Sequence, residues 1–407
     1  MTHSAARLRI AYVLDVFDGI KTGGVLSAHR FVEALRVRHE VTVVSTGVAA
    51  DGLVALPAFT PPPFGRVMRE MGFVFAVPRR RVLEEVLRRV DLVHAQFPFW
   101  LGMRTASLAR RLKVPLVAGF HVQPENMFAN VGVHWPALDE WTYRFFLRRF
   151  YNLADAVVCP SPFALEALRR RGLVAPAEVI SNGVPRWGSL PVATRPPARE
   201  GVVLVLVVGR LAREKRHDVI IEGVRRSRHA KRIQLVVTGR GPEEARVRQR
   251  AASLPRPAQV GFVSDAELDR LFATADVMVH ASEVELEGMA VLEALGRGTP
   301  ALIADARESA TPQLAVSPEF LFRAGDPADL ARRLDHLLDA PDRLEKARAE
   351  ALALAARFDL ADSVRRLEAL YARVAKGAGA RQQAALSAAA ADRAEPSARS
   401  TMRPAGR

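Results

Sequence analysis

Short apolar runs alternate with amphipathic stretches along most of the chain. An apolar run at Leu8–Asp15 leads to the glycine pair Gly23-Gly24, a helical pattern at Ser27–Arg38 and a second apolar run at Glu40–Ser45. Short, nearly continuous apolar runs are typical of parallel strands that are covered on both faces. The same pattern predicts strands at Asp91–Ala95, Pro115–Phe120 and Ala156–Cys159 and a helix at Thr105–Leu112.

The second half of the chain repeats this order. A strand is predicted at Gly201–Gly209, and a helix follows at Asp218–Arg228. Further strands are predicted at Ile233–Thr238, Ala258–Phe262, Val277–His280 and Ala301–Ala304, and further helices at Asp265–Ala273, Met289–Leu295 and Pro327–Leu338. Alternating strands and helices in both halves predict an α/β fold with two doubly wound, Rossmann-like domains.

These patterns divide the chain into five parts. We expect a first domain at 1–185, a proline-rich linker at 186–200 and a second domain at 201–350. A helical segment at 351–375 is expected to pack back toward the first domain. The tail at 376–407 is rich in alanine and has almost no large apolar side chain. Such a segment cannot offset the entropy of ordering, so it is predicted to be disordered.

The chain carries a strong positive charge. Its 407 residues include 59 Lys and Arg against 44 Asp and Glu, a formal net charge of +15. This balance indicates a polyanionic partner: a nucleic acid, an anionic membrane or a phosphate-bearing substrate. Three segments hold most of the excess: 66–89, 144–171 and 376–407.

Composition also argues against several kinds of site. Cys159 is the only cysteine, so the chain has no intrachain disulfide and no metal site built from cysteines. The sequence contains no run of about 18 apolar residues free of charge, so we expect no membrane-spanning helix. The first residues lack the apolar segment of a secretory signal. We therefore expect a cytoplasmic protein.

Two glycine-containing turns follow predicted strands. Gly23 and Gly24 let backbone amides approach an anion at the start of the next helix, although an ordinary tight turn uses the same residues. After the strand that ends at Gly209, Arg210 can donate two hydrogen bonds to two phosphate oxygens, and Lys215 supplies a compact positive charge. This second stretch is either an anion site beyond the carboxyl end of a strand or a solvated basic loop.

A third motif combines two carboxylates with a helix start. Glu285 and Glu293 are eight residues apart, and Gly288 lies where a helix is expected to begin. Amides at Gly288–Ala290 would be free donors for a diphosphate, with Glu285 in a loop and Glu293 in the second helical turn. The two carboxylates could accept hydrogen bonds from sugar and ribose hydroxyls. Glutamates beside a helix start are also common where no ligand binds.

Taken together, these motifs resemble the signature of retaining glycosyltransferases of the GT-B fold, family 4. The pattern E-x7-E followed by L-E-A-L-x-x-G-T-P occupies residues 285–300. Other parts of the family pattern occur in the family's order: Gly23-Gly24, Val93–Pro98, Gly119–His121, Ala154–Val158, Ile180–Val184, Gly209–Leu211, Glu214-Lys215, Val237–Gly241 and Val260–Val263. The resemblance covers about residues 8–370 and implies two Rossmann-like domains that face a cleft.

The resemblance implies roles for the matching residues. The expected catalytic residues are His121, Arg210, Lys215 and Glu285. The expected donor-binding residues are Gly23, Gly24, Gly239, Gly241, Phe262, Val263, Gly288, Met289, Ala290 and Glu293. Arg210 and Lys215 would neutralise the leaving diphosphate, while Glu285 would bind the sugar. Glu293 would bind the ribose of the nucleotide, and Phe262 would border the nucleobase.

The implied donor is a nucleotide sugar with UDP or GDP as its leaving group, and no further cofactor is expected. Cations and amides that are placed in advance favour the departing diphosphate over the ground state. Since no side chain stands out as a nucleophile, the resemblance implies front-face attack with retention. We expect no metal, because no Asp-x-Asp pair ends a strand and Arg210 with Lys215 can do the same electrostatic work.

Three positions depart from the family pattern. Gln96 stands where many members have a second histidine, and Pro185 replaces a frequent aspartate after Asn182. Glu287 replaces a common aromatic residue inside the E-x7-E motif, so it bears on the choice of donor sugar.

The expected acceptor is a lipid or a glycan at the inner face of the cell membrane. Residues 64–77 place apolar side chains at helical spacing, and Arg79–Arg81 follow at once. This segment either lies on an anionic membrane or packs on its own domain. Phe97, Phe99 and Trp100 either line an acceptor groove or simply pack. Residues 121–126, 282–287 and 303–309 are loosely similar to enzymes that glycosylate diacylglycerol-type lipids.

Two other functions stay open. The positive charge suits a nucleic-acid-binding protein, but the sequence has no recognition module, so we expect no nucleic-acid partner. A catalytically silent scaffold of the same fold is the second alternative, and the intact set of Arg210, Lys215, Glu285 and Glu293 argues against it. A nicotinamide dehydrogenase is disfavoured because the full glycine fingerprint is missing.

Overall fold

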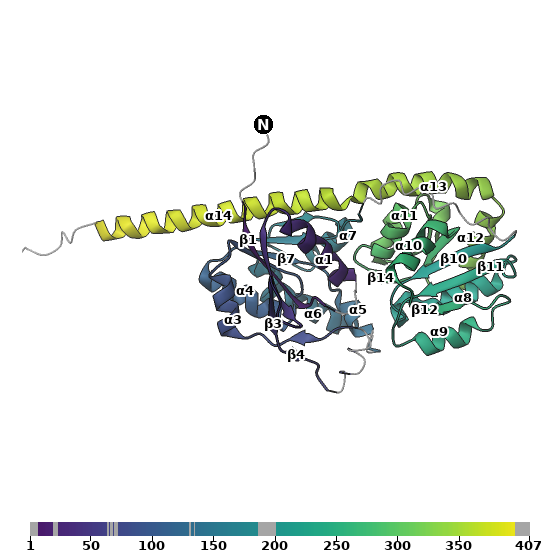
Figure 1. Cartoon of the computed structure of the whole chain (residues 1–407), viewed down its shortest axis with the longest axis horizontal. Coiled ribbons are helices and arrows are strands. Elements are labelled where there is room, and N and C mark those ends of the chain that lie inside the picture. The colour runs from purple at the N-terminus through teal and green to yellow at the C-terminus, as the bar shows by residue number, and fades with distance from the viewer. Residues whose placement is uncertain are drawn as a thin grey trace, which may run out of the picture.

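The computed structural model places two α/β domains side by side, with a long C-terminal helix that returns across the first one (Figure 1). It describes residues 7–18, 23–62, 65, 68, 72–129, 132–133, 135–185 and 201–394, with side chains up to residue 377. The predicted linker at 186–200 and most of the segment 64–71 lie outside the described residues. The predicted fold class, two doubly wound α/β domains, is confirmed.

The first domain is built on a parallel sheet in the order β3-β2-β1-β6-β7-β8-β9. Its strands are β1 (Arg9–Val16), β2 (Glu40–Thr46), β3 (Leu53–Leu56), β6 (Leu92–Ala95), β7 (Leu116–Gly119), β8 (Ala156–Cys159) and β9 (Ala177–Val179). Its helices are α1 (Gly23–Arg36), α3 (Arg80–Leu87), α4 (Trp100–Leu112), α5 (Pro124–Ala129), α6 (Pro136–Arg149) and α7 (Pro162–Arg169). A short antiparallel pair, β4 (Ala58–Phe59) and β5 (Phe75–Ala76), lies beside it.

The second domain is built on a parallel sheet in the order β12-β11-β10-β13-β15-β17. Its strands are β10 (Val203–Val208), β11 (Ile233–Thr238), β12 (Gln259–Gly261), β13 (Val277–His280), β15 (Ala301–Asp305) and β17 (Leu321–Arg323). Its helices are α8 (His217–Arg226), α9 (Glu244–Ala251), α10 (Asp265–Thr274), α11 (Met289–Gly296), α12 (Pro327–Leu338) and α13 (Pro341–Ala355). A separate two-residue pair joins β14 (Val284–Glu285) to β16 (Glu308–Ser309).

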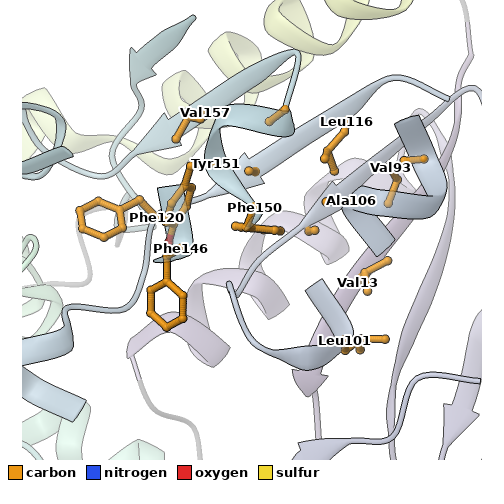
Figure 2. Close-up of a cluster of buried hydrophobic side chains, with 14 of the residues drawn as sticks. Val13, Val93, Leu101, Ala106, Leu116, Phe120, Phe146, Phe150, Tyr151 and Val157 are labelled. Carbon is orange, nitrogen blue, oxygen red and sulfur yellow. The ribbon is translucent and has the colours of Figure 1, made fainter. Parts of the chain in front are cut away.

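Aromatic rings fill much of the core of the first domain. Figure 2 shows Phe120, Phe146, Phe150 and Tyr151 gathered beneath the sheet. The Phe120 and Tyr151 rings meet edge to face with centroids 5.6 Å apart, an arrangement that aromatic pairs prefer. Because Phe120 is fully buried, this packing fixes the place at which the next residue, His121, leaves the sheet.

The last helix, α14 (Leu360–Ala394), packs on α1, β6 and β7 of the first domain. Leu367, Leu370 and Tyr371 join the core around β1, and the Tyr371 hydroxyl lies 2.6 Å from His94 Nδ1. The helix continues to Ala394, so it extends into the tail at 376–407, whose predicted disorder stays a prediction. Alanine has the highest helix propensity, which favours a helix even where little apolar surface is buried.

Two helices begin earlier than predicted. Helix α1 begins at Gly23 and not at Ser27, so the glycine pair forms its first turn instead of a turn before it. Helix α4 begins at Trp100 and not at Thr105. The start of α1 faces the second domain, since a Cβ built on Gly23 would lie 3.8 Å from Met289 Cγ.

Candidate active site

Residues that follow strands of the first sheet contact the β14–β16 region of the second domain. Ser161, after β8, donates from Oγ to the Leu286 carbonyl oxygen at 2.5 Å. Gln123, after β7, donates from Nε2 to the Glu308 carbonyl oxygen at 3.2 Å. In open α/β sheets ligands bind at this edge, so the facing edges of the two domains define the candidate site.

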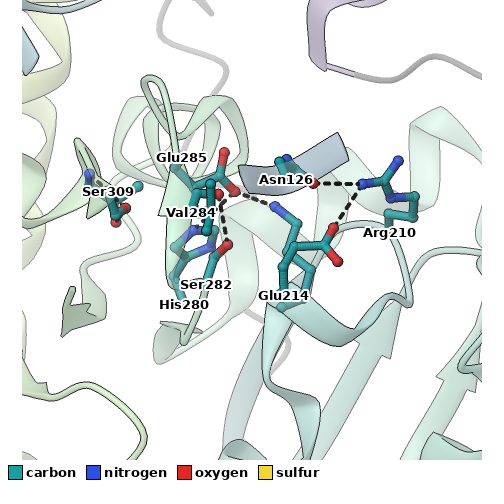
Figure 3. A network of polar contacts seen from close by, with 10 residues as sticks. Asn126, Arg210, Glu214, His280, Ser282, Val284, Glu285 and Ser309 are labelled. Carbon is teal, nitrogen blue, oxygen red and sulfur yellow. Dashed lines mark hydrogen bonds and ion pairs between the residues drawn. The ribbon is translucent and has the colours of Figure 1, made fainter. Parts of the chain in front are cut away.

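The centre of the site is an ion pair between Lys215 and Glu285, with His280 beside it (Figure 3). Glu285 Oε1 accepts a hydrogen bond from Lys215 Nζ and lies 3.4 Å from His280 Nε2. Burial would raise the pKa of the Glu285 carboxyl, but Lys215 and His280 outweigh it and hold that pKa below its usual range. Burial lowers the pKa of His280. Glu285 is therefore an ionised acceptor for a hydroxyl group, held in place by a cation.

Arg210 lies beside this pair and reaches across to the first domain. Its Nη2 donates to Glu214 Oε1 at 2.7 Å and to Asn126 Oδ1 of α5 at 3.4 Å (Figure 3). Within the described part of the chain, Arg210 Nε and Glu214 Oε2 are buried without a hydrogen-bond partner. Burying such groups unpaired is costly, which is typical of a site that a ligand completes.

The start of α11 has the geometry that the sequence predicted. Gly288 precedes the helix with φ of +98°, and an added Cβ would lie 2.4 Å from Thr311 Cγ2, so only glycine fits there. Met289 and Ala290 follow as the first helical residues, whose amides have no partner within the helix. Gly23 of α1 lies opposite, since a Cβ built on it would be 3.8 Å from Met289 Cγ.

The sequence predicted Glu285 in a loop, but the structure places it in a strand. It belongs to β14, which pairs with β16 in parallel register. The cause is a long-range partner: Val284 and Glu285 align with Glu308 and Ser309, which lie more than twenty residues further along the chain. This pairing fixes the carboxylate in front of Lys215.

Two further glutamates of the motif contact the first domain. Glu293 is buried and accepts a hydrogen bond from Arg30 Nη2 of α1 at 2.5 Å. Burial raises the pKa of Glu293, although Arg30 opposes that rise. Glu287 is also buried, and its Oε2 accepts from Asn182 N at 3.1 Å and Asn182 Nδ2 at 2.6 Å. Burial raises the pKa of Glu287 to about 7.

The predicted nucleobase side is a second cluster, formed by strand ends of the second sheet. A Cβ on Gly239 would lie 1.9 Å from the Gly209 carbonyl oxygen, and one on Gly241 would lie 2.4 Å from the Leu211 oxygen. Phe262 is 61 % exposed. Beside it, the Arg240 guanidinium stacks 4.4 Å from the ring centroid, which leaves an open aromatic and cationic surface.

The half-buried Val263 packs against the second-domain core. Of the aromatics after β6, Phe97 is buried in the core, and Phe99 packs 6.3 Å from Phe146. Trp100 is 48 % exposed. Packing therefore accounts for Phe97 and Phe99, and Trp100 is left at the surface.

His121 follows β7 on the first-domain side of the site. A Cβ on Gly119 would lie 2.9 Å from its Cδ2, and one on Gly24 would lie 3.5 Å from its Cβ. Burial lowers the pKa of His121 to about 4, so the ring is neutral near pH 7. A neutral imidazole can both donate and accept a hydrogen bond.

Most of the predicted residues thus gather in four clusters around the domain boundary. These lie at Lys215 and Glu285, at Gly239 and Phe262, at Gly24 and His121, and at the start of α11 opposite Gly23. Sequence reasoning did not find the contacts of His280 and Arg30. The place of His280 at the end of a buried strand was a usable signal. The pairing of Arg30 with Glu293 had none, because it depends on how the domains meet.

A cavity of about 490 Å³ opens between the domains next to this site. Trp135 and Val133 line it from the first domain, and Arg213, Arg216 and Glu214 line it from the second. None of the predicted site residues lines it. Among the described residues, no cluster of side chains suits a metal ion, and no helix combines the length and apolarity that crossing a membrane requires.

Comparison with known proteins identifies the family. The family model described as Glycosyl transferases group 1 matches residues 194–353, and the one described as Glycosyltransferase Family 4 matches residues 22–187. The chain belongs to the GT-B glycosyltransferases. The crystal structure of Anabaena HepE in complex with UDP and glucose has a TM-score of 0.69 over 89 % of this glycosyltransferase and 98 % of that chain, at 18 % identity, which supports the fold.

Two curated relatives are similar in sequence. A GDP-mannose-dependent alpha-mannosyltransferase of Mycobacterium tuberculosis is 31 % identical over 53 % of this glycosyltransferase and 56 % of the relative. The alpha-monoglucosyldiacylglycerol synthase of Streptococcus pneumoniae is 25 % identical over 53 % of this chain and 52 % of the relative. The chain therefore spans about half the length of these two relatives.

Proposed function

We propose that this glycosyltransferase moves a sugar from a UDP- or GDP-linked donor to a lipid or glycan acceptor with retention of the anomeric configuration. The observation that carries the proposal is the Lys215–Glu285 ion pair beside the open start of α11. Together these groups suit a sugar diphosphate. The cation and the helix amides would bind the diphosphate, and the carboxylate would accept a hydrogen bond from a sugar hydroxyl.

The chemistry follows from these placements. As the bond between sugar and phosphate breaks, negative charge grows on the diphosphate. Lys215, Arg210 and the amides at Met289 and Ala290 would stabilise that charge without rearrangement. Glu285 would hold a sugar hydroxyl, and Glu293 the ribose. Since Arg210 and Lys215 supply two positive charges, we propose that the reaction needs no metal ion.

The names of the relatives support the choice of donor and acceptor. One is described as GDP-mannose-dependent, and another as acting in the synthesis of monoglucosyldiacylglycerol. A lipid acceptor places the reaction at a membrane, and we propose the inner face of the cell membrane as its location. A catalytically silent scaffold is the alternative that the experiment must exclude.

The test is turnover of purified chain with UDP- and GDP-linked hexoses, in the presence and absence of EDTA. We expect release of one nucleoside diphosphate, an α-linked product by NMR from an α-linked donor, and no effect of EDTA. Glu285→Gln should lose activity and keep its thermal midpoint. A folded wild-type chain that releases no diphosphate from any donor would refute the proposal.

A further inference from the structure

Helix α6 carries large aromatic side chains on its outward face as well as its inward one. Buried against the first domain are Thr142, Tyr143, Phe146 and Leu147. Trp141, Arg144, Phe145 and Arg148 follow at spacings of three and four residues, so they share the opposite face. Trp141 is 60 % exposed, and both arginines are exposed. The outward stripe therefore joins two rings with two cations.

The two rings are held in one orientation. Trp141 and Phe145 stack with centroids 5.4 Å apart and an angle of 7° between their planes. Phe145 in turn lies 6.1 Å from the buried Phe146, which anchors the stack to the core. The rings thus form a preformed apolar plate on the surface instead of two mobile side chains.

The charge of this face is not balanced locally. From Trp141 to Arg149 the helix has three arginines and no acidic residue. In the part of the chain that the structure describes, Arg144, Arg148 and Arg149 form no ion pair. The nearest acid of the helix, Glu140, is already paired with Arg171 at 2.7 Å. The arginines are therefore available to an external anion.

The face is close to the candidate active site. Helix α5 packs on α6 and sends Asn126 to Arg210 at 3.4 Å. On the other side, Phe99 contacts Phe146, and the neighbouring Trp100 is exposed at the start of α4. A surface beneath this face would thus lie one helix away from the cleft.

We propose that the outward face of α6, formed by Trp141, Arg144, Phe145 and Arg148, docks on an anionic lipid bilayer. Exposed tryptophan beside arginine is the composition of interfacial helices, where rings enter the headgroup region and cations meet anionic lipids. The proposal relies on the proposed function only for its purpose, which is to bring a lipid acceptor to the cleft.

The experiment is co-sedimentation of the full chain with vesicles, without any sugar donor. We expect binding to vesicles of phosphatidylglycerol and phosphatidylcholine in equal parts, and weak binding to phosphatidylcholine alone. Arg144→Glu with Arg148→Glu, and separately Trp141→Ser, should each weaken binding about tenfold or more. The matched controls are Arg225→Glu with Arg226→Glu on α8, and the exposed Val174→Ser, both of which should bind as wild type does.

The outcomes separate this proposal from the catalytic one, since binding needs no turnover. Equal binding of the α6 variants and the wild type would overturn it. Loss of binding only in the triple variant Arg79→Glu, Arg80→Glu and Arg81→Glu, at the start of α3, would overturn it as well. Binding of the α6 face to duplex DNA, with no preference for anionic vesicles, would overturn it too. Circular dichroism and the thermal midpoint confirm that each variant is folded.

Discussion

The two domains share one architecture but meet each other with different chemistry. The second domain brings charged groups to the boundary: Lys215, Glu285, Arg210 and Glu214. The first domain contributes mostly neutral side chains to the hydrogen bonds between the domains. These side chains are Asn126, Gln123, Ser161 and Asn182. Their cores differ as well, because aromatic rings are frequent in the first and aliphatic side chains dominate the second.

This difference has a physical consequence. Neutral hydrogen bonds across a boundary cost little to exchange for water, about 1 kcal/mol each, whereas charged pairs inside one domain hold their geometry. The charged groups that we propose for donor binding therefore lie in the second domain, where their ion pairs do not depend on contact with the first. Among the contacts described here, separation of the domains would break the ion pair of Arg30 with Glu293, and the first-domain partners in the other contacts named above are neutral.

The largest effect should come from the tight backbone contact in the second domain. Gly239→Ala would place a Cβ 1.9 Å from the Gly209 oxygen, at a φ of +153°. We expect it to destabilise the chain by about 4 kcal/mol, from overpacking and strain together. The control, Gly172→Ala, has φ of +100° but nothing within 4 Å, and should cost only about 1–2 kcal/mol. Urea unfolding measures both, and equal costs would contradict the close approach.

Removing a charge from the second domain should nearly abolish activity without unfolding it. Lys215→Ala deletes the cation beside Glu285, so we expect a loss of about 10²–10³-fold in kcat/KM. Lys346→Ala, at a side chain that is 74 % exposed on α13, is the control and should keep full activity. Steady-state release of nucleoside diphosphate is the measurement. A loss below tenfold would show that Lys215 does not contact the leaving group.

Buried carboxyls make the stability of both domains depend on pH. Burial raises the pKa of Glu287 in the second domain and of Asp15 in the first to about 7. Between about pH 4 and 7 each holds a proton that the unfolded chain has lost, so stability falls as pH rises through this window. Glu287→Gln should cancel about 3 kcal/mol of that fall, and Asp15→Asn about 4 kcal/mol.

Thermal unfolding between pH 4 and 8 checks this expectation. The double variant should lose both contributions, because the two carboxyls lie in different domains and their effects should add. If Glu287→Gln falls with pH as steeply as the wild type, then Glu287 is ionised in the native state.

Periodicity predicted the parts of the fold that local sequence determines. The apolar runs of β8, β11 and β13 were predicted with the observed bounds. The glycine at 288 was correctly placed before α11, since only its conformation allows that helix start. What depends on distant partners was not predictable: β14 exists because β16 lies beside it. Helix α6 was missed because its aromatic residues occupy both faces and obscure the helical period.

The smallest effect should come from Arg30, the first-domain cation that pairs with Glu293 of the second domain. Arg30→Met removes the partner of Glu293, whose pKa is already raised by burial and should then rise further. A protonated Glu293 accepts hydrogen bonds poorly, so it would bind the ribose of the nucleotide sugar less well. The KM of this variant for the nucleotide sugar should therefore be about threefold to tenfold higher at pH 6 than at pH 8. The wild type should change little over this range. Arg36→Met, at the exposed end of the same helix, is the control. Equal pH profiles for all three chains would contradict a role of Glu293 in binding the nucleotide sugar.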